Sequence, residues 1–242
     1  MCHSRASLRI GALVSFLIAG PCVADNNSLV VEQIGEGHRA AVVQDGAGQS
    51  AEIVQGGTGA RDNRARLAQG SAPEAAAAAA FLGLDAGAPR FALRDAGALD
   101  GAGAVAGVDA TLADLLGELD GAAPGTGNAA ELRQTGSGNR ALAVQVGGRN
   151  RMLTEQQGDG NVGVHLQRGH GNDTELVQHG GGNVNALLAE GAVVGNDGGP
   201  LRLRATGDVR GFSIRASGPQ SYGTATVSRN GRGGLNIHLQ AR

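Results

Sequence analysis

The chain has 242 residues, enough for one large domain or two modest ones. Aromatic residues make up only 2% of it and glycine occurs 43 times, so a conventional aromatic-rich core would be thin and the backbone must turn often. The formal net charge of −2 and the absence of a basic run exclude the usual nucleic-acid-binding patterns.

Residues 1–24 read as a secretory signal peptide. Two arginines precede the apolar residues 10–19, and a small-residue cleavage site ends at Ala24, so Asp25 is the expected mature start. Because Cys2 and Cys22 both lie in this leader, the mature chain would have neither disulfides nor thiolate metal ligands. Lipidation at Cys22 is an alternative, although the preceding proline fits such a site poorly.

The first repeat block is expected over residues 25–69 and follows the pattern Gln-x-Gly-x-Gly-Asn-x-Ala-x-x-x-Gln. Two of its units replace the Asn, one with His38 and the other with Gln49. The block carries the recurring glutamines Gln33, Gln44, Gln55 and Gln69.

An Ala/Gly-rich insertion is expected over residues 70–122. Ser71 is a candidate cap for a short helix through the alanine run at 75–80, and residues 111–116 form a second helical patch ending near Gly117 or Gly121. We expect a weakly ordered, partly helical excursion without a second core. Four strand units precede it and six follow, so it leaves at a turn and the array can continue beneath it.

The second repeat block is expected over residues 123–189. Its unit from Gln134 to Gln145 matches every fixed position of the pattern. The block carries two sets of recurring amides, the glutamines Gln134, Gln145, Gln156, Gln167 and Gln178 and the asparagines Asn139, Asn150, Asn161, Asn172 and Asn183.

The tail, residues 190–242, is expected to form a diverged β-rich cap. Residues 201–205 and 212–215 alternate like strands, and residues 225–227 are flanked by glycines. Residues 235–240 are interpreted as a decayed final unit, with Gln240 in the glutamine position.

The spacing of the repeat favours a strand followed by a tight turn. Asn139, Ala141, Ala143 and Gln145 alternate and would share the inward face of one strand, while Leu142 and its neighbours point outward. The Gly-x-Gly segment supplies the reversal. Two units would make one rung, and stacked rungs would align Asn over Asn and Gln over Gln, with amides that hydrogen-bond along the stack. The predicted fold is therefore an all-β solenoid; a disordered Gly/Asn/Gln-rich tract is the alternative.

This repeat resembles that of the curlin family, the subunits of curli amyloid fibres. The resemblance covers residues of about 27–69 and 123–189, under half of the chain. It implies a secreted structural subunit that self-assembles with other curli subunits, leaves the cell through the outer-membrane curli secretion machinery and forms pilus-like fibres at the cell surface. Biofilm matrix and adhesion are the implied roles, and the long insertion and diverged tail fit a minor or nucleating subunit better than a plain major one.

The sequence indicates no enzyme. Its histidines are scattered without a metal-ligand or catalytic spacing, and the Gly-x-Gly-x-x-Ala matches to a dinucleotide fingerprint recur as repeat turns. No catalytic residue, cofactor, metal, nucleic-acid partner or small-molecule substrate is therefore expected. The main alternative is a monomeric β-solenoid adhesin or binding module; an inhibitor of such fibres is a weaker one.

Overall fold

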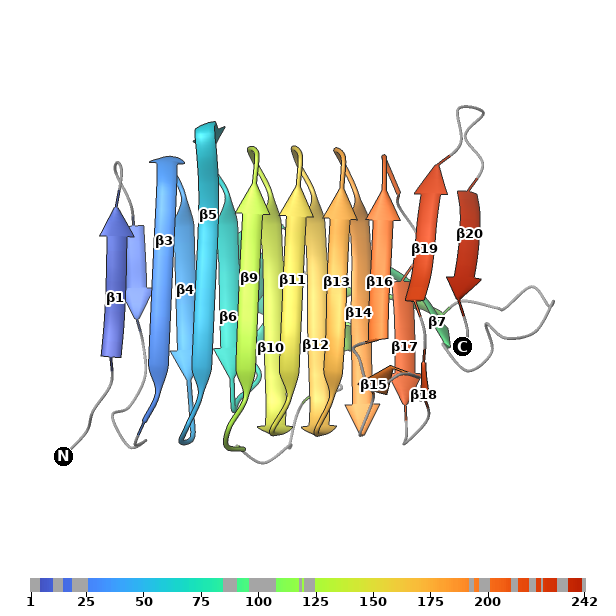
Figure 1. The fold of residues 1–242 in the computed structure, drawn as a ribbon, viewed down its shortest axis with the longest axis horizontal. Coiled ribbons are helices and arrows are strands. Elements are labelled where there is room, and N and C mark those ends of the chain that lie inside the picture. The colour runs from blue at the N-terminus through green and yellow to red at the C-terminus, as the bar shows by residue number, and fades with distance from the viewer. Residues whose placement is uncertain are drawn as a thin grey trace.

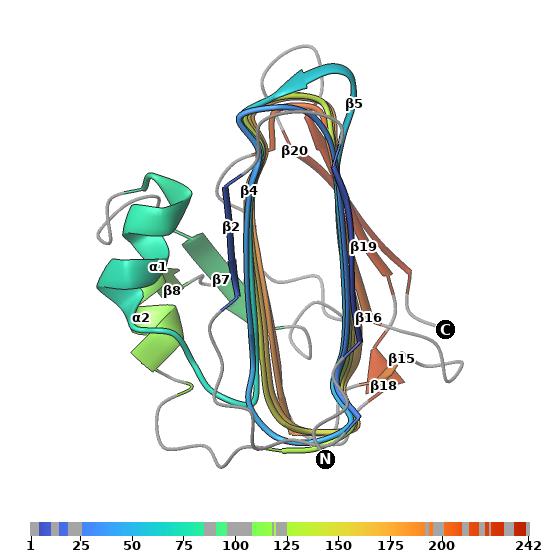
Figure 2. The same cartoon turned by 90° about the vertical axis from the view of Figure 1, so that its left-hand side faces the viewer.

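The protein is a stack of parallel strands arranged in two facing sheets, as expected for a β-solenoid (Figures 1 and 2). The computed structural model describes residues 5–10, 15–18, 26–84, 91–95, 108–117, 119, 125–191, 194–195, 201–209, 213–217, 221–222, 224–229 and 235–240. Within these ranges it contains two nine-stranded sheets, a two-stranded sheet and two helices.

The first sheet consists, in spatial order, of β1 (Arg5–Ile10), β3 (Ser28–Glu36), β5 (Ser50–Arg61), β9 (Ala129–Thr135), β11 (Arg151–Gln157), β13 (Asp173–His179), β16 (Leu201–Thr206), β19 (Thr224–Arg229) and β20 (Leu235–Gln240). The second sheet consists of β2 (Ser15–Ile18), β4 (Arg39–Gln44), β6 (Arg64–Gln69), β10 (Arg140–Gly148), β12 (Val162–His170), β14 (Val184–Gly191), β17 (Ser213–Ser217), β7 (Phe91–Asp95) and β8 (Val108–Ala110). The short strands β15 (Val194–Gly195) and β18 (Ser221–Tyr222) pair separately.

Consecutive strands of the repeat alternate between the two sheets, so two units make one rung. The insertion does not interrupt the stack, because β5 pairs directly with β9, with Gln55 opposite Gln134. In the second sheet β6 pairs with β10 in the same way, with Gln69 opposite Gln145. The solenoid predicted from the sequence is confirmed, and its array continues beneath the insertion.

The space between the sheets is filled by small and branched side chains in columns. Ile53 and Leu132 stack in the first sheet, Leu67 and Ala143 stack in the second, and all four are at most 1% exposed. The small residues at the alanine positions suit two sheets that face each other closely (Figure 2). The inward face of the strand is thus the one that the alternation predicts.

The insertion packs a second apolar core against the outer face of the second sheet, which differs from the expectation of an excursion without a core (Figure 2). Helix α1 (Ala75–Leu82) and helix α2 (Leu112–Gly117) contact each other, and α1 contacts β6 and β10. The outward side chains in the middle of β10 and β12 are apolar and are buried in this core. The cluster includes Ala78, Ala79, Leu82, Leu112, Leu115, Leu116, Leu142, Val144, Val146, Val164, Leu166 and Leu188.

The helices begin close to where the pattern places them. Helix α1 has Glu74 at its N-cap without a side-chain capping bond, so Ser71 is not the cap that the sequence suggests. Helix α2 starts after Thr111, whose hydroxyl accepts the Asp114 N–H at 3.2 Å, while the Asp114 carboxylate accepts the Thr111 N–H at 2.8 Å. This reciprocal cap closes the N-terminal end of α2.

Both ends of the stack depart from the repeat. Residues 235–240 pair antiparallel with β19, with Gln240 opposite Thr224, so their interpretation as a final repeat unit is wrong. At the other end β1 and β2, which lie in the predicted leader, pair in parallel with β3 and β4.

Candidate functional site

Nine glutamines, all of them buried except the half-buried Gln44, form two hydrogen-bonded ladders that run along the solenoid axis. In the first sheet each side-chain Nε2 donates to Oε1 of the next glutamine, over 2.6 Å from Gln33 to Gln55 and from Gln55 to Gln134. The ladder continues over 2.7 Å from Gln134 to Gln156 and from Gln156 to Gln178. Because each amide bonds the amides on both sides, a one-residue slip of any interior strand would break two of these bonds.

The second ladder follows the other sheet. Gln44 donates to Gln69 over 3.0 Å, Gln69 to Gln145 over 2.9 Å, and Gln145 to Gln167 over 2.7 Å. The amide of Gln145 also donates to the carbonyl oxygen of Ala129 in the opposite sheet, at 3.1 Å. These amides therefore hold neighbouring rungs in register and also tie the two sheets together.

The asparagines mark the point where each turn enters the next strand. Within the column, the Oδ1 of one asparagine accepts the backbone N–H of the equivalent residue one rung on, as from Asn161 to Asn139 at 3.0 Å and from Asn172 to Asn150 at 3.1 Å. The amide nitrogen donates along the same column, for example from Asn183 to Asn161 at 2.8 Å. The columns hold turns in register as the glutamines do for strands.

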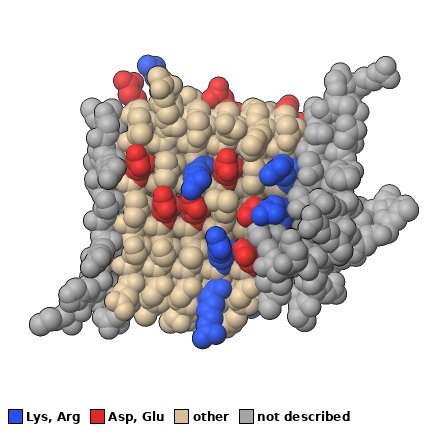
Figure 3. All heavy atoms as spheres, viewed as in Figure 1, with Lys and Arg blue, Asp and Glu red and all other residues tan. Residues whose placement is uncertain are grey.

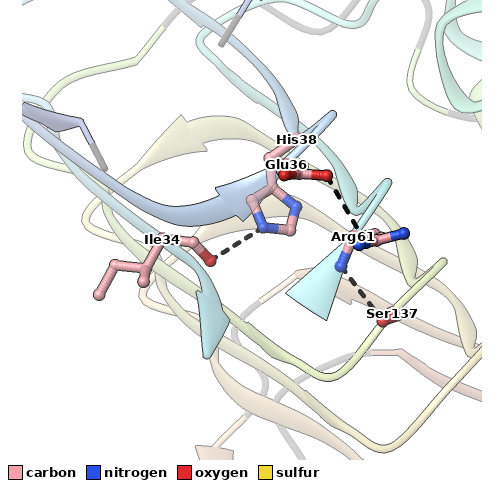
Figure 4. A network of polar contacts seen from close by, with 5 residues as sticks. All are labelled: Ile34, Glu36, His38, Arg61 and Ser137. Atoms are coloured by element: carbon pink, nitrogen blue, oxygen red, sulfur yellow. Dashed lines mark hydrogen bonds and ion pairs between the residues drawn. The ribbon is translucent and has the colours of Figure 1, made fainter. Parts of the chain in front are cut away.

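His38 and Gln49 occupy the asparagine column and perform the same task, although the sequence pattern alone shows them as mismatches. The N–H of Asn63 donates to His38 Nδ1 at 3.2 Å, and the N–H of Asn128 donates to Gln49 Oε1 at 3.2 Å. Since Nδ1 accepts, the ring proton is on Nε2, which donates to the carbonyl oxygen of Ile34 at 3.0 Å (Figure 4). Both residues stand where the repeat has its asparagine, five residues after a ladder glutamine, and this position is the sequence signal for their role.

The same turn is joined to the rung beyond the insertion. The N–H of Arg61 donates to the Ser137 hydroxyl at 3.1 Å, and the Arg61 guanidinium lies 3.6 Å from the Glu36 carboxylate (Figure 4). Both charged groups are more than half exposed, so this ion pair adds little stability. The hydrogen bond from the Arg61 N–H to Ser137 shows that the turns stack across the insertion as the strands do.

The first glycine of each turn lies against the turn of the next rung. Gly158 has φ of +108°, and a Cβ there would lie 2.3 Å from the carbonyl oxygen of Gly180. Gly160, the second glycine, has φ of +67° and nothing within 4 Å of a Cβ. Only the first glycine is therefore required for close stacking; the second supplies a left-handed conformation, which Arg149 adopts in another unit with φ of +57°.

His165, a histidine that could in principle serve as a catalytic group or metal ligand, has a structural role. The Nδ1 of His165 lies 3.0 Å from the Thr154 hydroxyl, its Nε2 lies 2.6 Å from the Thr174 hydroxyl, and it is fully buried between the sheets. Burial lowers the pKa of His165 to about 3, so the ring is neutral and structural at ordinary pH. Among the described residues no group of three His, Cys, Asp or Glu residues could hold a metal ion, and none of the described helices is long and apolar enough to cross a membrane.

The two ends of the ladders differ chemically. At the N-terminal end the buried Gln33 Oε1 has no hydrogen-bond partner among the described residues. At the C-terminal end alanines face the last glutamines, with Ala205 opposite Gln178 and Ala189 opposite Gln167. These glutamines turn to side chains nearby, since Gln178 donates to Asn185 at 2.9 Å and Gln167 donates to Thr174 at 2.7 Å.

Comparison with protein families matches residues 24–57 to the curlin associated repeat. Neither the curated proteins nor the solved structures contain a match to the chain. The matched residues span β3, β4 and the start of β5, and the structure repeats their geometry in the following rungs as far as β13 and β14. The family model confirms the predicted resemblance over residues 24–57, where the chain carries the curlin associated repeat.

Proposed function

We propose that this protein is a secreted, non-enzymatic subunit of curli-type extracellular fibres, with roles in biofilm matrix and adhesion. Its partners are other curlin-repeat subunits, and its route to the cell surface is cleavage after Ala24 followed by export through the outer-membrane curli secretion machinery. The observation that carries this proposal is the pair of unbroken glutamine ladders between parallel, in-register strands.

The physical argument is that an interior rung and a rung from another molecule can make the same contacts. An end strand presents free backbone N–H and C=O groups, and a second chain with the same pattern can add to them. Each ladder bond contributes only about 0.5–1.5 kcal/mol net, but the bonds repeat at every rung and specify one register. Fibre growth then extends the stacking already present within the chain.

The second candidate function is a monomeric β-solenoid adhesin or binding module. It is favoured by the antiparallel pairing at the C-terminal end, where β20 follows β19 in the first sheet and β8 follows β7 in the second. An antiparallel terminal strand breaks the parallel ladder that a stacking rung would continue. The two functions differ in whether the chain enters a fibre at all.

The test is co-assembly of the chain beginning at Asp25 with fragmented curli fibres, followed by sedimentation, thioflavin T fluorescence and fibre diffraction. We expect the chain to sediment with the fibres, which keep the reflection of about 4.7–4.8 Å. A chain that stays soluble beside the fibres for days would overturn the fibre function and support the monomeric module.

A further inference from the structure

The C-terminal edge of the solenoid is closed by strands that do not belong to the repeat (Figure 1). In the first sheet β16 is followed by β19 and then by the antiparallel β20. In the second sheet β17 is followed by β7 and then by the antiparallel β8, both from the insertion. Beyond the last repeat rung, both sheets therefore end in a strand of reversed direction.

The insertion is anchored so that it can reach this edge. Helix α1 packs on β6 and β10, in the middle of the stack, and Arg140 of β10 donates to the carbonyl oxygen of Gly83 at the helix end, at 3.2 Å. The same segment then pairs Leu93 of β7 with Ser213 of β17. The insertion thus connects the middle of the solenoid to its C-terminal edge.

At the N-terminal edge, by contrast, the first ladder ends in a glutamine whose side-chain oxygen has no hydrogen-bond donor among the described residues. Gln33 is fully buried and donates to Gln55, yet its own Oε1 receives no hydrogen bond among the described residues. The strand now beside it is β1, which places Ile10 opposite Gln33, where the ladder would require a glutamine. In the second sheet β2 ends with Ile18 opposite Val42, short of Gln44. Cleavage after Ala24 would remove both leader strands.

The outer face of β3 has further features of an interaction surface. Val30 and Ile34, which are 38% and 49% exposed, are the two exposed large apolar side chains among the described residues, and both lie on this strand. Glu32 lies between them, whereas Arg202 and Arg204 lie on β16 near the other end. Figure 3 shows acidic groups over the N-terminal strands of this face, and acidic and basic groups intermixed over the strands that follow. Glu32 and Arg204 occupy the same register position of the sheet, so an arginine at that position on the last strand of a partner chain would lie beside Glu32.

From these observations we infer that the chain enters a fibre through its N-terminal rung only and closes the end at which it sits. Its partner is the open last rung of another curlin-type chain, whose ladder glutamine donates to Gln33 Oε1. This inference rests on the proposed function and adds to it a direction: the partner stacks on β3 and β4, and no subunit stacks beyond β20 and β8.

The test locates the chain along curli fibres by electron microscopy. The chain beginning at Asp25 contains no cysteine, so a single cysteine added at its C-terminus can carry a gold label. Labelled chain is incubated with fragmented curli fibres and unlabelled curli subunits. We expect gold at one end of each fibre and elongation to stop at labelled ends. The matched variant lacks residues 230–242 and carries Leu93→Pro, which removes β20, leaves β19 in place and disrupts the pairing of β7; we expect its gold along the whole fibre.

The outcomes separate the inference from the function on which it rests. Gold along the fibre with the unaltered chain would overturn the closed end and leave the fibre function intact. Gold at the ends with both chains would overturn the assignment of β7, β8 and β20 as the closing strands. Absence of gold from all fibres, with soluble chain remaining, would overturn the fibre function itself.

A point variant tests the proposed acceptor. Gln33→Leu removes Oε1 and is expected to lower end labelling about fivefold, as for the loss of one ladder bond. Arg204→Ala, at the closed end, is the control and is expected to leave labelling unchanged. Circular dichroism before incubation verifies that both variants are folded. Unchanged labelling with folded Gln33→Leu would overturn the docking role of Gln33.

Discussion

The contribution of the ladders to stability can be measured at two adjacent glutamines of β11. Gln156 is buried in the first ladder, whereas its neighbour Gln157 points outward and is exposed. Replacing Gln156 with Leu removes its bonds with Gln134 and Gln178, both 2.7 Å, and its donation to the carbonyl oxygen of Arg140 at 3.1 Å. Gln157→Leu changes the same atoms at the surface and is the matched control.

The expected loss follows from counting these contacts. Three net hydrogen bonds amount to about 3 kcal/mol, and the Oε1 of Gln178 is left buried without its donor. Burial of the leucine offsets about 1 kcal/mol or more of the total, so we expect Gln156→Leu to lower the free energy of unfolding by about 2–4 kcal/mol. Gln157→Leu should change it by less than about 0.5 kcal/mol.

The assay is urea unfolding of the monomeric chain beginning at Asp25, followed by far-ultraviolet circular dichroism. Both variants should unfold with the slope of the unaltered chain, so that differences in midpoint report stability. Equal midpoints for Gln156→Leu and Gln157→Leu would refute the reasoning, because they would show that the ladder amides add nothing beyond what water supplies.

Three further changes test other parts of the fold. Gly158→Ala should lower the free energy of unfolding by about 3–5 kcal/mol, because the added Cβ would lie 2.3 Å from the carbonyl oxygen of Gly180. Gly160→Ala should lower it by only about 1 kcal/mol. Urea midpoints compare the two variants, and equal losses would contradict the role of the first glycine. Because the folded pKa of His165 is lowered to about 3 from 6.5, the unfolded chain binds a proton between these values that the folded chain does not. The contribution of the neutral His165 to the free energy of unfolding should therefore be complete above about pH 6.5 and should fall as the pH drops towards 3. Subtracting the pH dependence of the unfolding free energy of His165→Leu isolates this loss, and identical pH dependences would count against it. Leu115→Ala should cost about 2–5 kcal/mol in the same urea assay, since this side chain of α2 is fully buried in the apolar core that the insertion makes with the second sheet; a loss below 1 kcal/mol would argue against a second core there.

Much of the solenoid follows from local pattern. The alternation within the unit from Asn139 to Gln145 places polar and small side chains on one face, and the repeated spacing aligns equivalent residues once the chain reverses at each turn. The even number of units on either side of the insertion likewise predicts that β5 meets β9. The alternation depends on neighbours a few residues apart and the strand order on the number of units, and the sequence displays both directly.

Other features of the site were visible in the sequence only as departures from the pattern. His38 and Gln49 differ from the asparagine of the sequence pattern, and their ability to accept the next rung's N–H depends on the reach and orientation of the side chain. The apolar outward positions of β10, such as Leu142 and Val144, signalled that the second sheet needs a cover, whereas the outward positions of β9 and β11 are partly charged. The expectation of no second core overlooked that asymmetry.

The sequence by itself determined the repeat, the inward face of each strand and the register of its amides, because these follow from the two-residue period of a strand and the eleven-residue period of the unit. Only the tertiary structure decided what happens at the boundaries. It pairs β7 with β17, more than a hundred residues along the chain, and reverses β20 against β19. Such pairings depend on which edges remain free after the repeat has folded, so no local pattern specifies them.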